Sequence, residues 1–203
     1  MIKLSLIVSS FDRPEALRLC IQSLALQRGI EGGGLLPHFA VTVTDNSPDK
    51  LNQWVTKGLE RGISPAYFPS TFPGPYEPSE RIITAGLAKG EYLGFPSDDN
   101  WYAPEYVARM IRAAEENDWD LVYSDCIYDP RWLGVYSVME AYPKCGMVDK
   151  GGFIVRQSLF LEMGGWPKIE GGLCHPGSDG LFVEAAAARC KHGRVAEPMW
   201  FHG

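Results

Sequence analysis

The chain has 203 residues, enough for one substantial α/β domain and short for two. Its composition is that of an ordinary globular protein, with 45% hydrophobic and 22% charged residues. The formal net charge of −6 argues against a nucleic-acid-binding surface, which normally carries a basic excess, so we expect no nucleic-acid partner.

No segment of the sequence points to a membrane span, a leader peptide or a disulfide framework. No apolar run approaches the roughly 20 residues that cross a bilayer, and residues 1–8 read as a strand without a signal-peptide cleavage pattern. The five cysteines are scattered and lack a C-x-x-C spacing, which favours reduced thiols over a zinc site. We therefore expect a cytoplasmic protein without a transmembrane segment, leaving peripheral membrane contact and the oligomeric state open.

The first half of the chain alternates predicted strands and helices. This alternation indicates an α/β fold in which helices flank a mostly parallel central sheet. Ligands of such sheets bind outside the carboxyl ends of the strands, and three of these ends carry polar residues. Strands are predicted at residues 3–9, 39–44, 66–68 and 91–95, helices at 14–25, 51–59 and 79–89, and the polar strand ends are residues 9–13, 45–47 and 97–100.

The second half is less regular. Aromatic residues, Pro130, Pro143 and Gly146 indicate a hairpin or long loop between residues 125 and 148. No linker separates independent domains, so we predict a single domain over residues 1–203, with a nucleotide-binding half at 1–100 and an acceptor-binding half at 101–203. The other elements predicted here are helices at 104–117, 157–163 and 178–191, strands at 120–124 and 152–155, and an extended segment at 195–200.

Asp98 and Asp99 follow a predicted buried strand. Two adjacent carboxylates at a strand end can hold a hard divalent cation whose other ligands are phosphate oxygens and water. Such an ion would neutralise charge that develops on a departing diphosphate. The alternative is a polar turn before the next helix, and the pair by itself does not decide between them.

Six motifs in order resemble those of the glycosyltransferase family 2 enzymes of the GT-A fold, over nearly the whole chain. Asp98 and Asp99, after Ser97, occupy the place of the family's D-x-D metal motif, and Ser178-Asp179 takes the position of its acidic E-D pair. Each motif alone is loose, and it is their order and spacing that carry the resemblance. The others are residues 8–14, residues 43–47, Arg81 with residues 85–95, and residues 156–166.

The resemblance implies an inverting transfer from a nucleoside-diphosphate sugar, with a UDP-sugar favoured, to a hydroxyl of a sugar or glycan acceptor. It implies that Asp45 hydrogen-bonds the nucleobase, that Ser9 and Phe11 line the base and ribose site, and that Arg81 faces the nucleotide or its diphosphate. The residues implied to bind the nucleotide sugar are Ser9, Phe11, Arg13, Asp45, Arg81 and Asp98.

The same resemblance implies Mn²⁺ or Mg²⁺ as cofactor, with Asp99 as a metal ligand, Asp98 in contact with the ribose or the metal, and His202 as a further contact to the metal or the diphosphate. Asp179 is implied as the general base that deprotonates the acceptor. Asp179 could equally be a favourable charge at a helix N-terminus, and His202 could belong to a disordered tail.

The sequence departs from the family pattern at several positions. Phe11 lacks the hydroxyl of the usual tyrosine, Asp12 replaces an asparagine, and Ser97 stands where another Asp is common. Ser178 replaces the usual Glu, so the implied base lacks its acidic neighbour. Two other classes stay open, a nucleotidyltransferase and a non-catalytic nucleotide- or carbohydrate-binding domain. The glycines at 32–34 follow a helix rather than open one, which argues against a dehydrogenase.

Overall fold

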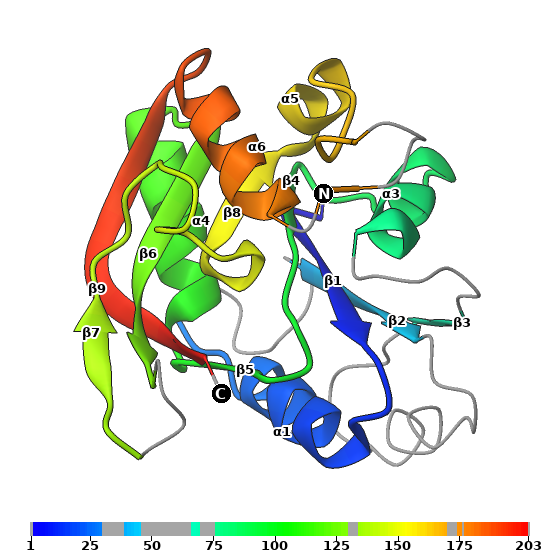
Figure 1. Ribbon diagram of the computed structural model, residues 1–203, viewed down its shortest axis with the longest axis vertical. Coiled ribbons are helices and arrows are strands. Elements are labelled where there is room, and N and C mark those ends of the chain that lie inside the picture. The colour runs from blue at the N-terminus through cyan, green and yellow to red at the C-terminus, as the bar shows by residue number, and fades with distance from the viewer. Residues whose placement is uncertain are drawn as a thin grey trace.

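The structure is a computed structural model that describes residues 2–29, 39–45, 66–69, 76–129, 134–169, 174–175 and 177–202. Nine strands in these ranges form one sheet that runs through both halves of the chain (Figure 1). The strands are β1 (Leu4–Ser10), β2 (Phe39–Asp45), β3 (Ala66–Pro69), β4 (Tyr92–Gly94), β5 (Asn100–Tyr102), β6 (Leu121–Tyr128), β7 (Ser137–Met139), β8 (Phe153–Arg156) and β9 (His192–His202). The helices are α1 (Pro14–Ala25), α3 (Glu77–Thr84), α4 (Tyr106–Asn117), α5 (Gln157–Glu162), α6 (Ser178–Ala187) and the short 3₁₀ helix η1 (Lys150–Gly152).

The strand order is β3-β2-β1-β4-β8-β6-β9-β5, and β7 pairs with β6. The strands from β3 to β4 are parallel to one another. Beyond them the sheet is mixed, since β8 is antiparallel to both β4 and β6, whereas β6 and β9 are parallel. The predicted α/β sheet flanked by helices is therefore confirmed, with its parallel part in the first half of the chain. Because parallel strands end at one edge of a sheet, the residues after β1, β2 and β4 are brought together.

Helices cover both faces of the sheet, as expected for β1, whose seven residues are all buried. Leu6 and Val8 pack in a cluster with α1 and α4, whereas Ile7 packs in a second cluster with α3, α5 and α6 (Figure 1). Burying apolar side chains on both faces supplies most of the driving force for this arrangement. No helix among the described residues has the length and apolar character to cross a membrane.

Most predicted elements are present within a few residues of their expected bounds. The stretch between residues 125 and 148 contains a hairpin, because β6 continues to Tyr128 and pairs antiparallel with β7. The predicted helix at 51–59 lies outside the described residues. The sequence reading did not include β5, and it ended the last extended segment at residue 200, whereas β9 runs to His202.

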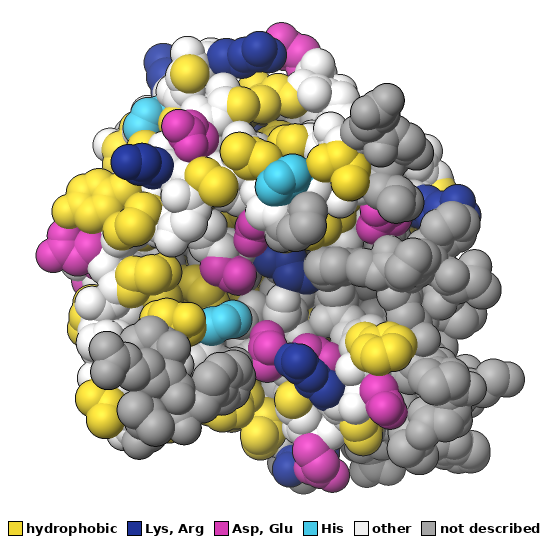
Figure 2. All heavy atoms as spheres, viewed as in Figure 1, with side chains coloured by type: hydrophobic (Ala, Val, Ile, Leu, Met, Phe, Trp, Pro, Cys, Tyr) yellow, Lys and Arg dark blue, Asp and Glu magenta, His cyan; other side chains and the backbone are white. Residues whose placement is uncertain are grey.

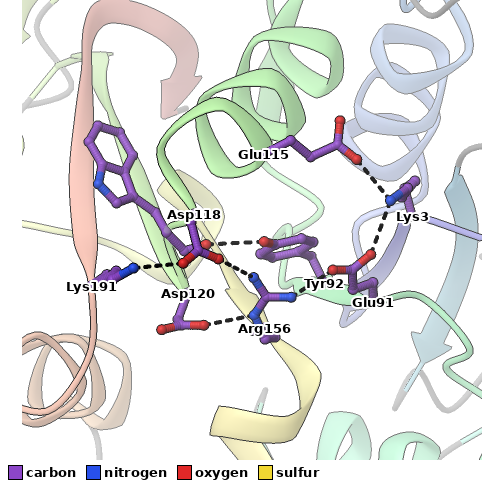
Figure 3. Close-up of polar contacts among 9 residues, drawn as sticks. Lys3, Glu91, Tyr92, Glu115, Asp118, Asp120, Arg156 and Lys191 are labelled. Carbon is purple, nitrogen blue, oxygen red and sulfur yellow. Dashed lines mark hydrogen bonds and ion pairs between the residues drawn. The ribbon is translucent and has the colours of Figure 1, made fainter.

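An ion-pair network ties the strands together at the edge where β1 and β4 begin (Figure 3). Its centre is Arg156, whose guanidinium lies 2.6 Å from Glu91 Oε1 and 2.7 Å from Asp120 Oδ1. Lys3 contacts the other Glu91 oxygen at 3.1 Å and Glu115 on α4 at 2.8 Å. Burial alone would raise the pKa of Glu91, but the hydrogen bonds and charges of Lys3 and Arg156 outweigh it and lower that pKa.

Candidate active site

The three polar strand ends named in the sequence meet at one edge of the sheet. In the register of β1 with β2, Ser10 lies opposite Asp45. Beyond β4 the chain continues alongside β1, where the Ser9 amide donates to the Pro96 carbonyl and the Asp98 amide donates to the Ser9 carbonyl, both at 3.0 Å. The expected convergence is thus confirmed for the backbone. The side chain of Asp45 lies outside what the structure describes.

Asp98 holds the loop that follows β1. Its Oδ2 accepts hydrogen bonds from the Ser10 hydroxyl at 2.8 Å and from the Phe11 amide at 3.1 Å. The next residue, Asp12, has a φ of 50°, a left-handed conformation that Asp tolerates better than most residues. Burial raises the pKa of Asp98, while the hydrogen bonds from Ser10 and Phe11 oppose that shift. One oxygen of Asp98 is therefore committed to shaping the loop, which leaves Oδ1 toward the site.

Asp99 has one oxygen paired and one unpaired. Arg13, from the loop before α1, places a guanidinium nitrogen 2.6 Å from Asp99 Oδ2 and 3.6 Å from Asp98 Oδ1. Asp99 Oδ1 is buried and accepts no hydrogen bond from the residues that the structure describes. Buried carboxylate oxygens normally have a partner, so this atom is the natural point for a ligand or cation.

His202 is fixed by Asn100, its partner in the register of β5 with β9. Asn100 Oδ1 accepts from the Ser97 amide at 2.8 Å, which assigns the other end of the amide, Nδ2, to His202 Nδ1 at 3.2 Å. The hydrogen bond from Nδ2 makes Nδ1 an acceptor, so the neutral ring carries its proton on Nε2. In this arrangement His202 is a hydrogen-bond donor toward the site.

The residues at this edge fit a divalent cation through Asp99. A Mg²⁺ or Mn²⁺ ion is commonly held by one or two carboxylates together with substrate phosphates, and Asp99 Oδ1 supplies one such oxygen. The described residues contain no group of three or more His, Cys, Asp or Glu side chains that could hold a metal ion by itself. Ligation through His202 Nε2 would move the ring proton to Nδ1 and require the Asn100 amide to turn over, so the prediction for His202 remains a prediction.

Asp179 lies in the first turn of α6 and is held by backbone donors. Its Oδ2 accepts from the Lys150 amide at 3.0 Å, and its Oδ1 accepts from the Gly180 amide at 2.8 Å. The Tyr76 hydroxyl also hydrogen-bonds Asp179; burial raises the pKa of Tyr76, and the charge of Asp179 raises it further. These contacts fix the orientation of the carboxylate in the wall of a cavity of about 280 Å³ that His202 also lines.

Asp149 is a second carboxylate in the wall of that cavity, and the sequence interpretation missed it. It caps η1 by accepting from the Gly151 amide at 2.9 Å. Burial raises the pKa of Asp149, and the nearby charge of Asp179 raises it further. The acidic neighbour that Ser178 does not provide in the sequence is therefore supplied by Asp149 from another element. The signal available was an Asp-Lys pair and two glycines directly before a buried strand.

Lys150 is the other missed residue, and it lies between the two acidic pairs. Its side chain is only 5% exposed, and Nζ has no hydrogen-bond partner among the described residues. The ammonium lies 5.9 Å from the centre of the Tyr76 ring. Burial lowers the pKa of Lys150, while the charges of the four carboxylates (Asp149, Asp179, Asp98 and Asp99) act in the opposite direction. One buried cation thus senses both the strand-end carboxylates and the α6 carboxylate.

A second cavity, of about 490 Å³, is lined by Asp99, Arg13 and again His202. Aromatic side chains form much of its wall, with Trp101 stacked on Phe201 at 4.9 Å between ring centres. Figure 2 shows acidic and basic side chains and a histidine gathered near the centre of this face of the molecule. His202 therefore lines both the cavity that contains Asp99 and the cavity that contains Asp149 and Asp179.

One predicted residue, Arg81, lies apart from this cluster, whereas Phe11 and Ser9 join it through their backbones. Arg81 is exposed on α3 and lines neither of the two cavities, so its predicted role toward the nucleotide remains a prediction. Phe11 is 60% exposed, so its ring is accessible beside the loop that its amide helps to fix. Ser9 is buried in β1 and joins the site through its backbone pairing with residues 96–98.

Comparisons with known proteins agree with this geometry. The model of the family "Glycosyl transferase family 2" matches residues 5–141. Among solved structures, residues 1–349 of S. aureus TarS match with a TM-score of 0.75 at 20% identity, covering 99% of this chain and 60% of that one. That TarS fragment has also been solved with UDP and with UDP-GlcNAc.

A mannosyltransferase, PcManGT from Pyrobaculum calidifontis in complex with GDP-Man and Mn²⁺, matches with a TM-score of 0.73 at 14% identity, covering 98% of this chain and 56% of that one. This chain thus spans less than two thirds of the length of these structures. No curated protein sequence matches it.

Proposed function

This chain belongs to glycosyl transferase family 2, and from that premise we propose that it transfers a glycosyl group from a nucleoside-diphosphate sugar to an acceptor hydroxyl, with inversion. The observation that carries the proposal is Asp179. Its carboxylate is oriented by two backbone donors in the wall of a cavity, and it lies within electrostatic range of the same lysine as Asp98 and Asp99. A base and a diphosphate site on either side of a reacting carbon are what a single displacement requires.

In the proposed mechanism the acceptor oxygen attacks the anomeric carbon while Asp179 accepts the hydroxyl proton. A positioned carboxylate contributes a rate factor of ~10²–10⁴ in such a step. The bond from the anomeric carbon to the diphosphate breaks, and its electron pair remains on the departing diphosphate. His202 is suited to donate a hydrogen bond from Nε2 to that diphosphate, because Asn100 occupies Nδ1.

The proposed cofactor is Mn²⁺ or Mg²⁺, with Asp99 Oδ1 as the protein oxygen that would hold it. When bound, such an ion supplies positive charge against the diphosphate oxygens. The complex of PcManGT with GDP-Man and Mn²⁺ supports this part of the proposal.

The donor is proposed to be a UDP-sugar, which the UDP and UDP-GlcNAc complexes of TarS support. The test is a thermal-shift panel of UDP, GDP, dTDP and CDP, each with and without Mn²⁺. A ligand that binds only the folded protein raises its free energy of unfolding, by about 2.7 kcal/mol when the ligand is in hundredfold excess over Kd. The melting temperature rises accordingly.

UDP is expected to give the largest shift, and a larger one with Mn²⁺ than without. A larger shift with GDP would keep the enzyme class and change the donor base. No shift with any of the four nucleotides would remove the donor site, and with it the proposed function.

A further inference from the structure

Lys150 is the buried charged group for which the proposed mechanism has no role so far. A buried ammonium carries three N–H donors, and leaving them unpaired costs considerably more than leaving a neutral donor unpaired. All carboxylates of the described residues lie beyond ion-pair distance of its Nζ, although four of them act on it electrostatically. The N–H donors of this ammonium are therefore available to a group that is not among the described residues.

Several contacts fix the position of η1, the helix that carries Lys150. Lys150 belongs to η1, whose Gly151 carbonyl accepts hydrogen bonds from the hydroxyls of Tyr102 and Tyr106, each at 3.2 Å. A side chain at position 151 would collide with Asn100, so η1 packs directly against the segment that carries Asp98 and Asp99. The backbone of Lys150 meanwhile binds Asp179. The backbone of η1 thus contacts both the segment after the strand-end carboxylates and the proposed base.

Charge indicates which part of the donor would bind Lys150. Asp98 and Asp99 would repel a diphosphate, and Arg13 offsets only part of that charge from the exposed side of the pair. Lys150 brings a second cation from the buried side, where the charges of Asp149 and Asp179 act on it more strongly than those of Asp98 and Asp99. In a nucleoside-diphosphate sugar whose sugar is uncharged, the diphosphate is the only anionic group. A lysine ammonium binds phosphate oxygens as a point charge.

We propose that Lys150 donates hydrogen bonds to the β-phosphate of the nucleoside-diphosphate donor and stabilises it as the leaving group. This inference rests on the proposed function. The anomeric carbon–oxygen bond breaks with its electron pair on the β-phosphate, the acceptor oxygen bonds to that carbon, and Asp179 takes the acceptor proton. Lys150 exchanges no proton. Because charge grows on the β-phosphate as the bond breaks, the contact strengthens toward the transition state.

The test is isothermal titration of UDP and UMP, with and without Mg²⁺, into the full chain and three variants. Lys150→Met removes the charge and nearly preserves volume, Lys150→Arg keeps the charge, and Lys191→Met removes an exposed charge at the opposite edge of the sheet as a matched control. Lys150→Met is expected to weaken UDP binding by about 10- to 100-fold, the range of a charged hydrogen bond, and UMP binding by less than about threefold. Lys150→Arg should retain part of the preference for UDP, and Lys191→Met all of it.

The melting temperatures of the variants separate a ligand contact from a structural counter-ion. Lys150→Met is expected to melt at or above the temperature of the parent protein, because it removes a buried charge that lacks a hydrogen-bond partner. A lower melting temperature with an unchanged ratio of UDP to UMP affinity would make Lys150 a structural counter-ion and overturn the proposal. Equal losses for UDP and UMP would also overturn it. If the parent protein bound neither nucleotide, the proposed function would fail first, and this inference with it.

Discussion

At the edge of the sheet where β1 and β4 begin, Arg156 is surrounded by acidic partners. At the edge where these strands end, two buried charged atoms have no hydrogen-bond partner among the described residues. Arg156 contacts Glu91 and Asp120 and lies 5.0 Å above the ring of Tyr92 (Figure 3). At the other edge, Asp99 Oδ1 and Lys150 Nζ have no hydrogen-bond partner among the described residues. Satisfied charges can hold a fold together, while unsatisfied ones cost stability and are available to a ligand.

The pKa values of carboxyl groups are shifted in opposite directions at the two edges of the sheet. The pKa of Glu91 is lowered, so its ionised form stabilises the fold. The pKa of Asp149 is raised, so its ionised form costs stability. This contrast distinguishes residues that stabilise the fold from residues with a proposed role in catalysis. Substitutions at either edge of the sheet can test it.

The largest expected effect is on turnover at the edge that carries Asp179. Asp179→Asn removes the base and nearly preserves volume, but its single amide oxygen keeps an acceptor for only one of the amides of Lys150 and Gly180. Turnover of the donor should fall by ~10²–10⁴-fold with nucleotide affinity nearly unchanged, while the melting temperature falls modestly because one backbone amide loses its acceptor. Steady-state rates and titrations on the same preparation would measure this, and an undiminished rate would exclude Asp179 as the base.

The next effect is on stability at the other edge. Arg156→Met would leave Asp120 without its cation, and Glu91 with Lys3 alone, in a partly buried setting. We expect the free energy of unfolding to fall by about 2 kcal/mol, because removing one partner strands the other charges. Urea denaturation would measure it. Nucleotide affinity should stay constant, and a changed affinity would contradict the division between the two edges.

A smaller effect of opposite sign is expected for Asp149→Asn. The folded-state pKa of Asp149 lies above its unfolded value, so the ionised carboxylate destabilises the fold at neutral pH. Removing the charge should raise the free energy of unfolding on the order of 1 kcal/mol, typical of a single substitution. The gain should shrink as the pH falls through the raised pKa and vanish below 3.8, the ordinary pKa of Asp, where the carboxyl of the parent is protonated in both the folded and the unfolded state. Thermal unfolding from pH 4 to pH 8 would show this slope, and a gain independent of pH would contradict it.

The smallest effect is expected for Lys191→Met in the same region as Arg156. Lys191 lies 2.7 Å from Asp118, but both side chains are largely exposed. Exposed ion pairs are screened by water and salt and contribute little to stability, so urea denaturation should hardly distinguish this variant from the parent. A loss as large as that of Arg156→Met would mean that proximity, rather than burial, sets the strength of the network.

The sequence was sufficient for elements whose cause is local. The apolar run before Ser10 predicts β1, and Pro14 at the first turn predicts the start of α1; both are present. Asp98 and Asp99 could be located because they directly follow such a run. β5 was missed because three residues leave too short a pattern to distinguish a strand from the turn before it.

Asp149 and Lys150 could not be predicted, since what brings them into the site is packing between distant segments. η1 is held by hydrogen bonds from Tyr102 and Tyr106, about 45 residues earlier in the chain. The orientation of the Asn100 amide, which assigns the proton of His202, likewise depends on a strand pair formed across the whole second half. No local spacing in the sequence encodes either arrangement.

The central claim, a single displacement with Asp179 as base, is tested most directly by the configuration of the product. UDP-GlcNAc, or the donor that the nucleotide panel selects, would be turned over with water as acceptor, and the anomer formed first would be followed by proton NMR. An α-linked donor should yield the β anomer, and Asp179→Asn should slow its appearance. The α anomer as the first product would contradict a single displacement and the role proposed for Asp179.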